Sequence, residues 1–394
     1  MTLAAAAVRA RVLSDSSKKE KLARLEAMEQ QRFAAERQSP ARNKKNFIEK
    51  LRIAFLGKKI VESSNTTAIS TSELFVLPAA SAEGHPQVSA PPGFTPPKPR
   101  PLRVTGDLIT LLSAILALGV RLGAGVLVCG WRPRLSFRAP AAGAYSLKLG
   151  PLHLSDTSSV LRGELPRPTG RLILYEFDSS PFCRKVRDAL TMLDLTAEMR
   201  PTPGAGIAPP NVFSDEHLDL HGRRTVPFLL DEGMRVAMFE SEEIVKYLYR
   251  TYGPGEQNIP GMLRGLIALI SSGTSAVIRG MPADKLQVDA RTDNHLMRPL
   301  TIYGYEGSPF VHPVREKLSA LGLPHTVIPC GRGSANRALL AERTGRQFQV
   351  PHLIDPNTGV EMSESIEIRM YLDRVYTTSG YTPLRGGSYL SELA

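Results

Sequence analysis

The chain has 394 residues, of which 42% are hydrophobic and 22% charged, so two or three globular domains are expected and a disordered, collagen-like or multi-span membrane protein is excluded. Its three cysteines lie far apart, which excludes a disulfide-stapled secreted scaffold and a cysteine-based zinc finger. The net charge of +11 comes mostly from residues 1–100, with 17 Lys and Arg against 9 Asp and Glu, so no basic groove and no nucleic-acid partner are expected.

Residues 1–102 read as a basic, largely disordered leader. Met1 to Ser14 is rich in Ala and Arg and free of acids, as at the start of an organelle-targeting transit peptide. Residues 16–37 mix both charges like a solvated helix, and residues 47–60 form a basic amphipathic stretch suited to an anionic membrane surface. Residues 60–100 read as a stiff, unpacked linker rich in Ser, Ala and Pro. A leader without any activity of its own is the alternative to targeting.

Residues 103–134 contain the most apolar segment of the chain, for which a helix is predicted. The run from Leu108 to Trp131 reaches the ~20 residues that a bilayer span needs, but a central Arg121 costs about 2.5–3.5 kcal/mol in a span. Gly119 and Gly123 have the spacing that allows close helix packing. We therefore expect a helix that is buried against the folded part or membrane-associated, with a single span as the alternative.

The second half of the chain contains an internal repeat. RLILYEFDSSPFCRKVRDALTML opens the first copy and PLTIYGYEGSPFVHPVREKLSAL the second, so that Ser180 and Ser308 lie 128 residues apart. Further on, a Val-Pro pair and a Glu-Ser pair recur with an offset of 124 residues. These pairs are Val226-Pro227 and Glu240-Ser241 in the first copy, and Val350-Pro351 and Glu364-Ser365 in the second.

Each copy has the element pattern of a small α/β domain. A β-rich run leads into a helix with Pro near its start, and after a variable stretch come two strands and a closing amphipathic helix. One more β-α unit is expected in the variable stretch, giving a four-stranded mixed sheet covered by helices. The predicted domains are 168–255 and 299–378. Residues 256–298 are read as a linker with an apolar helix, and 379–394 as a tail.

These motifs resemble a known family. Ser-Pro-Phe-Cys after a strand, then Val-Pro, then Glu-Ser, resembles the thioredoxin-like N-terminal domain of glutathione S-transferases and of glutaredoxins. Two such domains in tandem, behind a basic leader and an apolar segment, are similar to plant and algal plastid proteins of this type. The resemblance implies an α/β fold of two thioredoxin-like domains, glutathione or another small thiol as ligand or cosubstrate, and a chloroplast location, with the mitochondrion as the alternative.

The first turn of the first helix in each copy carries the candidate catalytic residues. A thiolate at a helix N-terminus is stabilised by the helix dipole, and dithiol exchange needs a second thiol one turn later. The two places hold Ser180 and Cys183 in the first copy, and Ser308 and Val311 in the second. Because neither copy has a dithiol, disulfide reductase activity is not expected.

Each of these residues also has a structural interpretation. In the transferases that this chain resembles, a serine here donates a hydrogen bond to the glutathione sulfur, whereas the alternative is that Ser180 and Ser308 only cap their helices. Cys183 is a candidate nucleophile. The alternative is a buried thiol with no chemical role, because free cysteines are usually buried. Cys330, in the loop PCGRGS, is expected to be exposed and open to glutathionylation.

The Val-Pro and Glu-Ser pairs are the candidate binding residues. Val226-Pro227 and Val350-Pro351 are expected to be cis, which leaves the valine backbone free to pair with a peptide-like ligand. Ser241 and Ser365 begin helices and can hold a carboxylate, while Glu240 and Glu364 can meet an ammonium group. Alternatively, these pairs only close the fold.

Two functional hypotheses follow. The first is a glutathione-binding thioredoxin-fold protein with weak glutathione transferase or monothiol redox activity. The alternative is a non-catalytic, membrane-associated interaction scaffold built from two degenerate thioredoxin folds. Neither residues 253–298 nor residues 377–394 can supply the helical C-terminal domain that a complete transferase needs. His217 and His221 are four residues apart but have no third ligand, so no metal is predicted.

Overall fold

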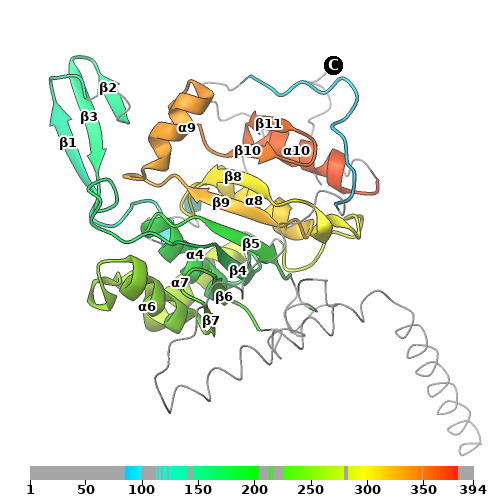
Figure 1. Cartoon of the computed structure of the whole chain (residues 1–394), viewed down its shortest axis with the longest axis horizontal. Helices are drawn as coiled ribbons and strands as arrows, with labels where there is room; N and C mark the ends of the chain where they lie inside the picture. Colours follow the sequence, from blue (N-terminus) through cyan, green and yellow to red (C-terminus); the bar gives the residue numbers. More distant parts are fainter. Residues whose placement is uncertain are drawn as a thin grey trace, which may run out of the picture. The chain divides into compact units, whose positions relative to one another are not determined.

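The structure is a computed structural model in which two thioredoxin-like domains stand in tandem (Figure 1). The described residues are 85–98, 112, 115–116, 119–121, 124–140, 145–203, 213, 215, 225–278, 283–347 and 349–379. The leader up to residue 84, nearly all of the tail, Gly123 and both His217 and His221 lie outside them.

The described part of the first domain has the order β-α-β-β-β-α, and the stretch in which the helix of the additional β-α unit is expected lies almost wholly outside the described residues. Its elements are β4 (Leu172–Glu176), α4 (Pro181–Met192), β5 (Ala197–Pro201), β6 (Phe228–Asp231), β7 (Val236–Phe239) and α6 (Ser241–Tyr252). The second domain has the expected order in full, with a helix, α9, after its second strand. Its elements are β8 (Leu300–Gly304), α8 (Val311–Ala320), β9 (His325–Pro329), α9 (Asn336–Thr344), β10 (His352–Asp355), β11 (Val360–Ser363) and α10 (Ser365–Tyr376).

The sheets of the two domains are continuous. The strands form one eight-stranded sheet in the order β11-β10-β8-β9-β5-β4-β6-β7. The two domains meet at β5 and β9, each of which is the edge strand of its own domain. These two strands pair antiparallel, with Ala197 opposite Val327 and Met199 opposite His325. β4 is parallel to β5 and β8 is parallel to β9, so β4 and β8 run in opposite directions. The carboxyl ends of these two strands therefore lie at opposite ends of the joined sheet, along the direction of the strands.

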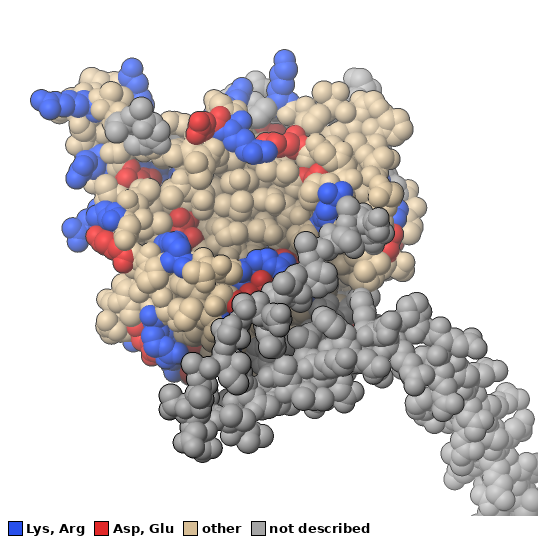
Figure 2. Space-filling view, in the orientation of Figure 1, with Lys and Arg blue, Asp and Glu red and all other residues tan. Residues whose placement is uncertain are grey.

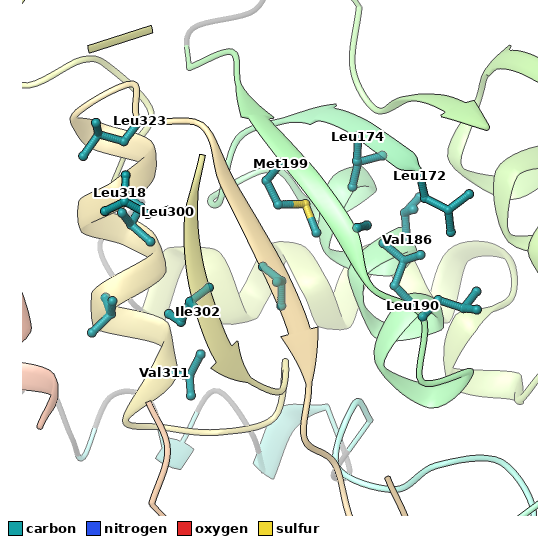
Figure 3. Close-up of a cluster of buried hydrophobic side chains, with 14 of the residues drawn as sticks. Leu172, Leu174, Val186, Leu190, Met199, Leu300, Ile302, Val311, Leu318 and Leu323 are labelled. Carbon is teal, nitrogen blue, oxygen red and sulfur yellow. The ribbon is translucent and has the colours of Figure 1, made fainter. Parts of the chain in front are cut away.

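One buried hydrophobic cluster extends through both domains. Val186 and Leu190 of α4, Met199 of β5 and Leu318 of α8 belong to it (Figure 3). Phe182, four residues before the buried Val186 on α4, is exposed. The buried face of the helix begins one residue later, at Cys183, and one residue turns the side chain by about 100° around the helix axis.

Each closing helix is attached to its sheet in the same way. In the first domain the phenol groups of Tyr247 and Tyr252 both donate hydrogen bonds to the buried carboxylate of Asp231, at 2.8 and 2.5 Å. Tyr371 and Tyr376 donate equivalent bonds to Asp355. A buried carboxylate needs such partners, which explains why two tyrosines recur at the same positions in the repeat.

The chain before the first domain is folded onto the two domains at several points. The linker was expected to be unpacked, but its Phe94 lies against Tyr371, with ring centroids 5.2 Å apart, because an aromatic ring this close to an apolar surface gains by leaving water. Among the described residues, the helix predicted within 103–134 ends at Val120: residues 124–131 form a connecting segment of turns and bends with one β-bridge at Leu127, and β1 begins at Arg132. Gly125 and Gly130 have positive φ angles of 75° and 68°, which a helix does not contain.

Arg121 lies within the folded part. Its side chain is fully buried, pairs with Asp188 of α4, and donates to Ser271 Oγ at 2.7 Å. Ser271 belongs to α7 (Gly265–Ile278), the helix expected in the linker. β1 (Arg132–Ser136), β2 (Ser146–Leu149) and β3 (Leu152–Thr157) form a separate antiparallel sheet that the sequence patterns did not predict. Among the described residues, no helix is both long enough and apolar enough to cross a bilayer.

Candidate functional site

The strand register brings the serine loop, the Val-Pro pair and the Glu-Ser pair of each copy to the same end of neighbouring strands. In the first domain Phe228 of β6 lies opposite both Tyr175 of β4 and Phe239 of β7. The loop to Ser180, the Val226-Pro227 pair and the Glu240-Ser241 pair therefore leave neighbouring strands at the same end. In the second domain His352 lies opposite Tyr303 and Ser363, which brings Ser308, Val350-Pro351 and Glu364-Ser365 together in the same way.

The two candidate sites are separate. Because β4 and β8 run in opposite directions, one site lies at each end of the joined sheet.

Both serine hydroxyls accept a hydrogen bond from the first turn of the following helix, and Ser180 is the N-cap of α4. Ser180 is 4% exposed and its Oγ accepts from Cys183 N at 3.3 Å. Ser308 is 1% exposed and its Oγ accepts from Val311 N at 3.4 Å. Such a cap satisfies one of the free N–H groups of the first turn and contributes about 1 kcal/mol. Their role toward a glutathione sulfur stays a prediction.

The serines are buried because each domain covers the loop of the other. Asp178 N, two residues before Ser180, donates to Ser319 Oγ of α8 at 3.4 Å. Glu306 N, two residues before Ser308, donates to Thr191 Oγ1 of α4 at 3.3 Å. These two contacts are equivalent in the repeat, since both donors and both acceptors are 128 residues apart.

The connecting segment, residues 124–131, covers the second loop further. Gly125 O accepts from Gly307 N at 3.1 Å, and Leu127 pairs with Arg332 as in a parallel strand. At the other side, Cys129 N donates to Met192 O at 2.7 Å. The segment therefore contacts α4 of the first domain and two loops of the second.

The cysteines of this region are buried thiols. Cys183 is fully buried, and burial together with the nearby Glu176 carboxylate raises the pKa of its thiol to about 12. Cys330 was expected to be exposed, but only 2% of it is, and burial raises its pKa as well. Cys330 is covered because its N–H bonds to Gly304 O and the following residues pair with the connecting segment.

A buried ion-pair network joins the two domains between the candidate sites. Arg187 of α4 bonds to Glu176 of its own domain at 2.5 Å and to Glu306 of the other at 3.1 Å. Arg315 of α8, which corresponds to Arg187 in the repeat, pairs with Glu306 and lies 3.5 Å from Asp178. Burial alone would raise the pKa of Glu306, but the two guanidinium groups outweigh it and hold the pKa well below its usual range.

Three groups at the border of this network come close enough to hold a metal ion. Ligand atoms of Asp178, His312 and Glu316 all lie within 4.8 Å of one another. However, Arg184 Nη2 lies 3.1 Å from His312 Nε2, and the Asp178 carboxylate has guanidinium nitrogens of Arg187 and Arg315 at 3.6 and 3.5 Å. Arginine already provides the positive charge that a cation would bring, so we assign no metal here.

The Val-Pro and Glu-Ser pairs have the same backbone geometry in both domains. Both Val-Pro peptide bonds are cis, as expected. Glu240 and Glu364 have φ angles of 68° and 82°, a left-handed conformation that costs a residue with a side chain on the order of 1 kcal/mol. In each case the strained glutamate immediately precedes a 12-residue helix whose N-terminus has no side-chain cap.

The two sites differ in how accessible the glutamate is. Glu240 is exposed, and Ser241 is the first residue of α6. Glu364 is half-buried and its Oε1 accepts from Gln349 Nε2 at 3.2 Å. The carboxylate of the first domain is therefore the more available of the two.

Sequence reasoning did not identify the ion-pair network or the Thr191 and Ser319 contacts as the reason why the loops are covered. A signal was present, since Arg187 and Arg315 recur at the same offset as the serines. A polar residue repeated on the face of a helix that also carries the apolar stripe is a candidate for a buried polar contact.

The fold defines a class of protein: a pair of thioredoxin-like domains in tandem. Residues 174–257 and 302–380 each match the family described as "Glutathione S-transferase, N-terminal domain". No curated protein matches the chain at a significant level.

Two solved structures show limited similarity. One is a Bombyx mori glutathione transferase in complex with GTT, 26% identical over 24% of this chain and 42% of that one, with a TM-score of 0.19. The chain thus spans less than half the length of that enzyme. The other is Leishmania TDR1, described as a unique trimeric glutathione transferase, 14% identical over 53% of this chain and 68% of that one, with a TM-score of 0.22.

Proposed function

We propose that the chain binds glutathione, or a related γ-glutamyl thiol, at the first domain. The observation that carries this proposal is the strained glutamate before an uncapped helix, present in both copies. A left-handed glutamate has a backbone cost that a merely structural turn would avoid with glycine. The match of both domains to the glutathione transferase N-terminal family supports the choice of ligand.

Each part of the site suits one part of such a ligand. The free N–H groups at the start of α6 and the Ser241 hydroxyl suit the γ-glutamyl carboxylate. The exposed Glu240 carboxylate suits the α-ammonium group, and the half-buried Val226 backbone can pair with the cysteinyl part. The first domain is preferred because Glu364 in the second is already hydrogen-bonded to Gln349.

Any glutathione transferase or monothiol redox activity would be weak. A buried thiol with a pKa of about 12 supplies almost no thiolate near neutral pH, so Cys183 does not support monothiol exchange. Ser180 could polarise a glutathione sulfur only after the loop contact to Ser319 opens. The burial of both serines is the specific observation that favours the alternative, a non-catalytic scaffold. A chloroplast location remains a proposal from the leader and the resemblance.

Calorimetric titration of the full chain with glutathione tests the proposal. We expect Ser241→Ala and Glu240→Gln to weaken binding by roughly tenfold or more, because each removes a charge-assisted contact. The matched variant Ser365→Ala, at the equivalent position of the second domain, should bind like the unmodified chain. Absence of binding by a folded chain would reject the proposal in favour of the scaffold, and equal loss from Ser365→Ala would show that the second domain is used.

A further inference from the structure

The helix α7 has its polar face inward. Among the residues of this helix whose burial is described, the buried ones are small or carry a hydroxyl group: Ala268, Ser271, Ser272, Ser275 and Ala276. Its outer face carries Ile270 and Val277, which are 64% and 67% exposed, with Thr274 between them. For these described residues the arrangement is the reverse of an ordinary amphipathic helix on a globular protein, which buries its large aliphatic residues.

The inward serines have a clear physical reason. Ser275 Oγ accepts from Arg184 Nη1 at 2.7 Å, and Ser271 Oγ accepts from Arg121 Nη1 at 2.7 Å. Both guanidinium groups are buried, so they need acceptors. The side of α7 that carries acceptors must therefore face α4, and the aliphatic side is left facing outward.

A second group of exposed aliphatic residues precedes the contact of Arg121 with α7. Leu112, Ile115 and Leu116 are each about half exposed, and their spacing puts them on one face of a helix. The chain following them reaches α7 through Arg121, which also donates to Ala268 O at 3.2 Å. No charged residue occurs in residues 108–120 or in α7.

We propose that these two aliphatic faces rest in the interfacial region of an anionic lipid bilayer, so that the protein binds a membrane from one side. This surface is independent of the glutathione site. At 14 residues α7 is about 21 Å long, shorter than the ~30 Å hydrocarbon core, so it would lie along the surface.

The composition and the charge of the chain favour lipid over a protein partner. The exposed residues are aliphatic, without the Tyr, Trp or Arg that usually dominate protein interfaces. Residues 1–100, which precede Leu112, hold 17 Lys and Arg against 9 Asp and Glu, and such a basic segment is attracted to anionic headgroups. On the face of the folded part in Figure 2, by contrast, basic and acidic residues are interspersed.

Flotation of the full chain with vesicles tests this proposal. Vesicles of phosphatidylcholine with added phosphatidylglycerol should carry the protein, and the double variant Ile270→Ser/Val277→Ser should bind at least roughly tenfold less. Leu339→Ser is the matched control, because Leu339 is equally exposed but lies on α9. It should float like the unmodified chain.

Two further measurements separate the outcomes. Ile270→Trp should show a blue shift of its fluorescence on adding vesicles, which reports insertion without removing apolar area. Glutathione titration of the double variant should be unchanged, so failure of one proposal does not imply failure of the other. The membrane proposal is overturned if the double variant floats like the unmodified chain, as it would if the leader alone bound. It is also overturned if the unmodified chain does not bind vesicles and the double substitution instead dissociates a dimer of the chain.

Discussion

Replacing Arg315 by Met should destabilise both domains at once. The Arg315 side chain is 4% exposed, pairs with Glu306, and lies 3.5 Å from carboxylate oxygens of Glu176 and Asp178. Met fills most of the volume but leaves Glu176 and Asp178 with Arg187, and Glu306 with Arg187 and the more distant Arg184, for compensation. Removing one partner from a buried ion pair typically costs about 3–5 kcal/mol, because an unpaired charge then stays in a low-dielectric environment. A domain pair of this kind has about 5–15 kcal/mol in total.

Urea unfolding followed by far-ultraviolet circular dichroism measures this effect. With a dependence of about 2–3 kcal/mol per molar urea, the midpoint should fall by about 1–2.5 M. Arg343→Met is the matched control, because Arg343 pairs with Glu361 at 2.7 Å on the surface, where a pair contributes about 0–1 kcal/mol. The further change Asp178→Asn should restore part of the loss, since it removes one uncompensated charge. If Arg315→Met costs no more than Arg343→Met, the network does not hold the domains together.

Two other predictions follow from buried groups. Burial, aided by Arg184, lowers the pKa of His312 to about 3, and burial lowers that of His325 to about 4. Because unfolded imidazole titrates near 6.5, the stability from these neutral rings is fully present above that pH and is lost as the pH falls toward 4, by up to ~1.4 kcal/mol per pH unit for each ring. Urea unfolding midpoints measured at several pH values check this loss. A His312→Gln variant whose midpoint depends on pH as strongly as that of the unmodified chain would contradict it. Gly125→Ala should lower the free energy of unfolding by about 2–4 kcal/mol, because φ is 75° and a Cβ would lie 2.6 Å from an Asp188 oxygen. The control Gly93→Ala, at a similar φ in open space, should lower it by about 1 kcal/mol, as measured by thermal unfolding. Equal losses in the two variants would show that the close contact has no effect.

Local chain chemistry was enough to predict the elements of each domain. Pro181 after Ser180 indicated the start of α4, and the capping bond from Cys183 N is the consequence of that local order. The offsets between the copies predicted two domains of one fold, since a repeated spacing from Val-Pro to Glu-Ser requires the same hairpin twice. These features depend on neighbours within a few residues or on one hairpin, so the sequence by itself determined them.

The way in which the two domains join was decided only by the tertiary structure. β5 and β9 meet through backbone hydrogen bonds, which carry no residue signature, so the joined sheet could not be read from a pattern. The pairing of β5 with β9 buries Ser180 and Ser308. It also buries the arginines of the ion-pair network on α4 and α8, which would otherwise face solvent. The inverted polarity of α7 has the same origin. A hydrophobic pattern records which face is apolar, but whether the other face meets water or a buried guanidinium depends on contacts between distant parts of the chain.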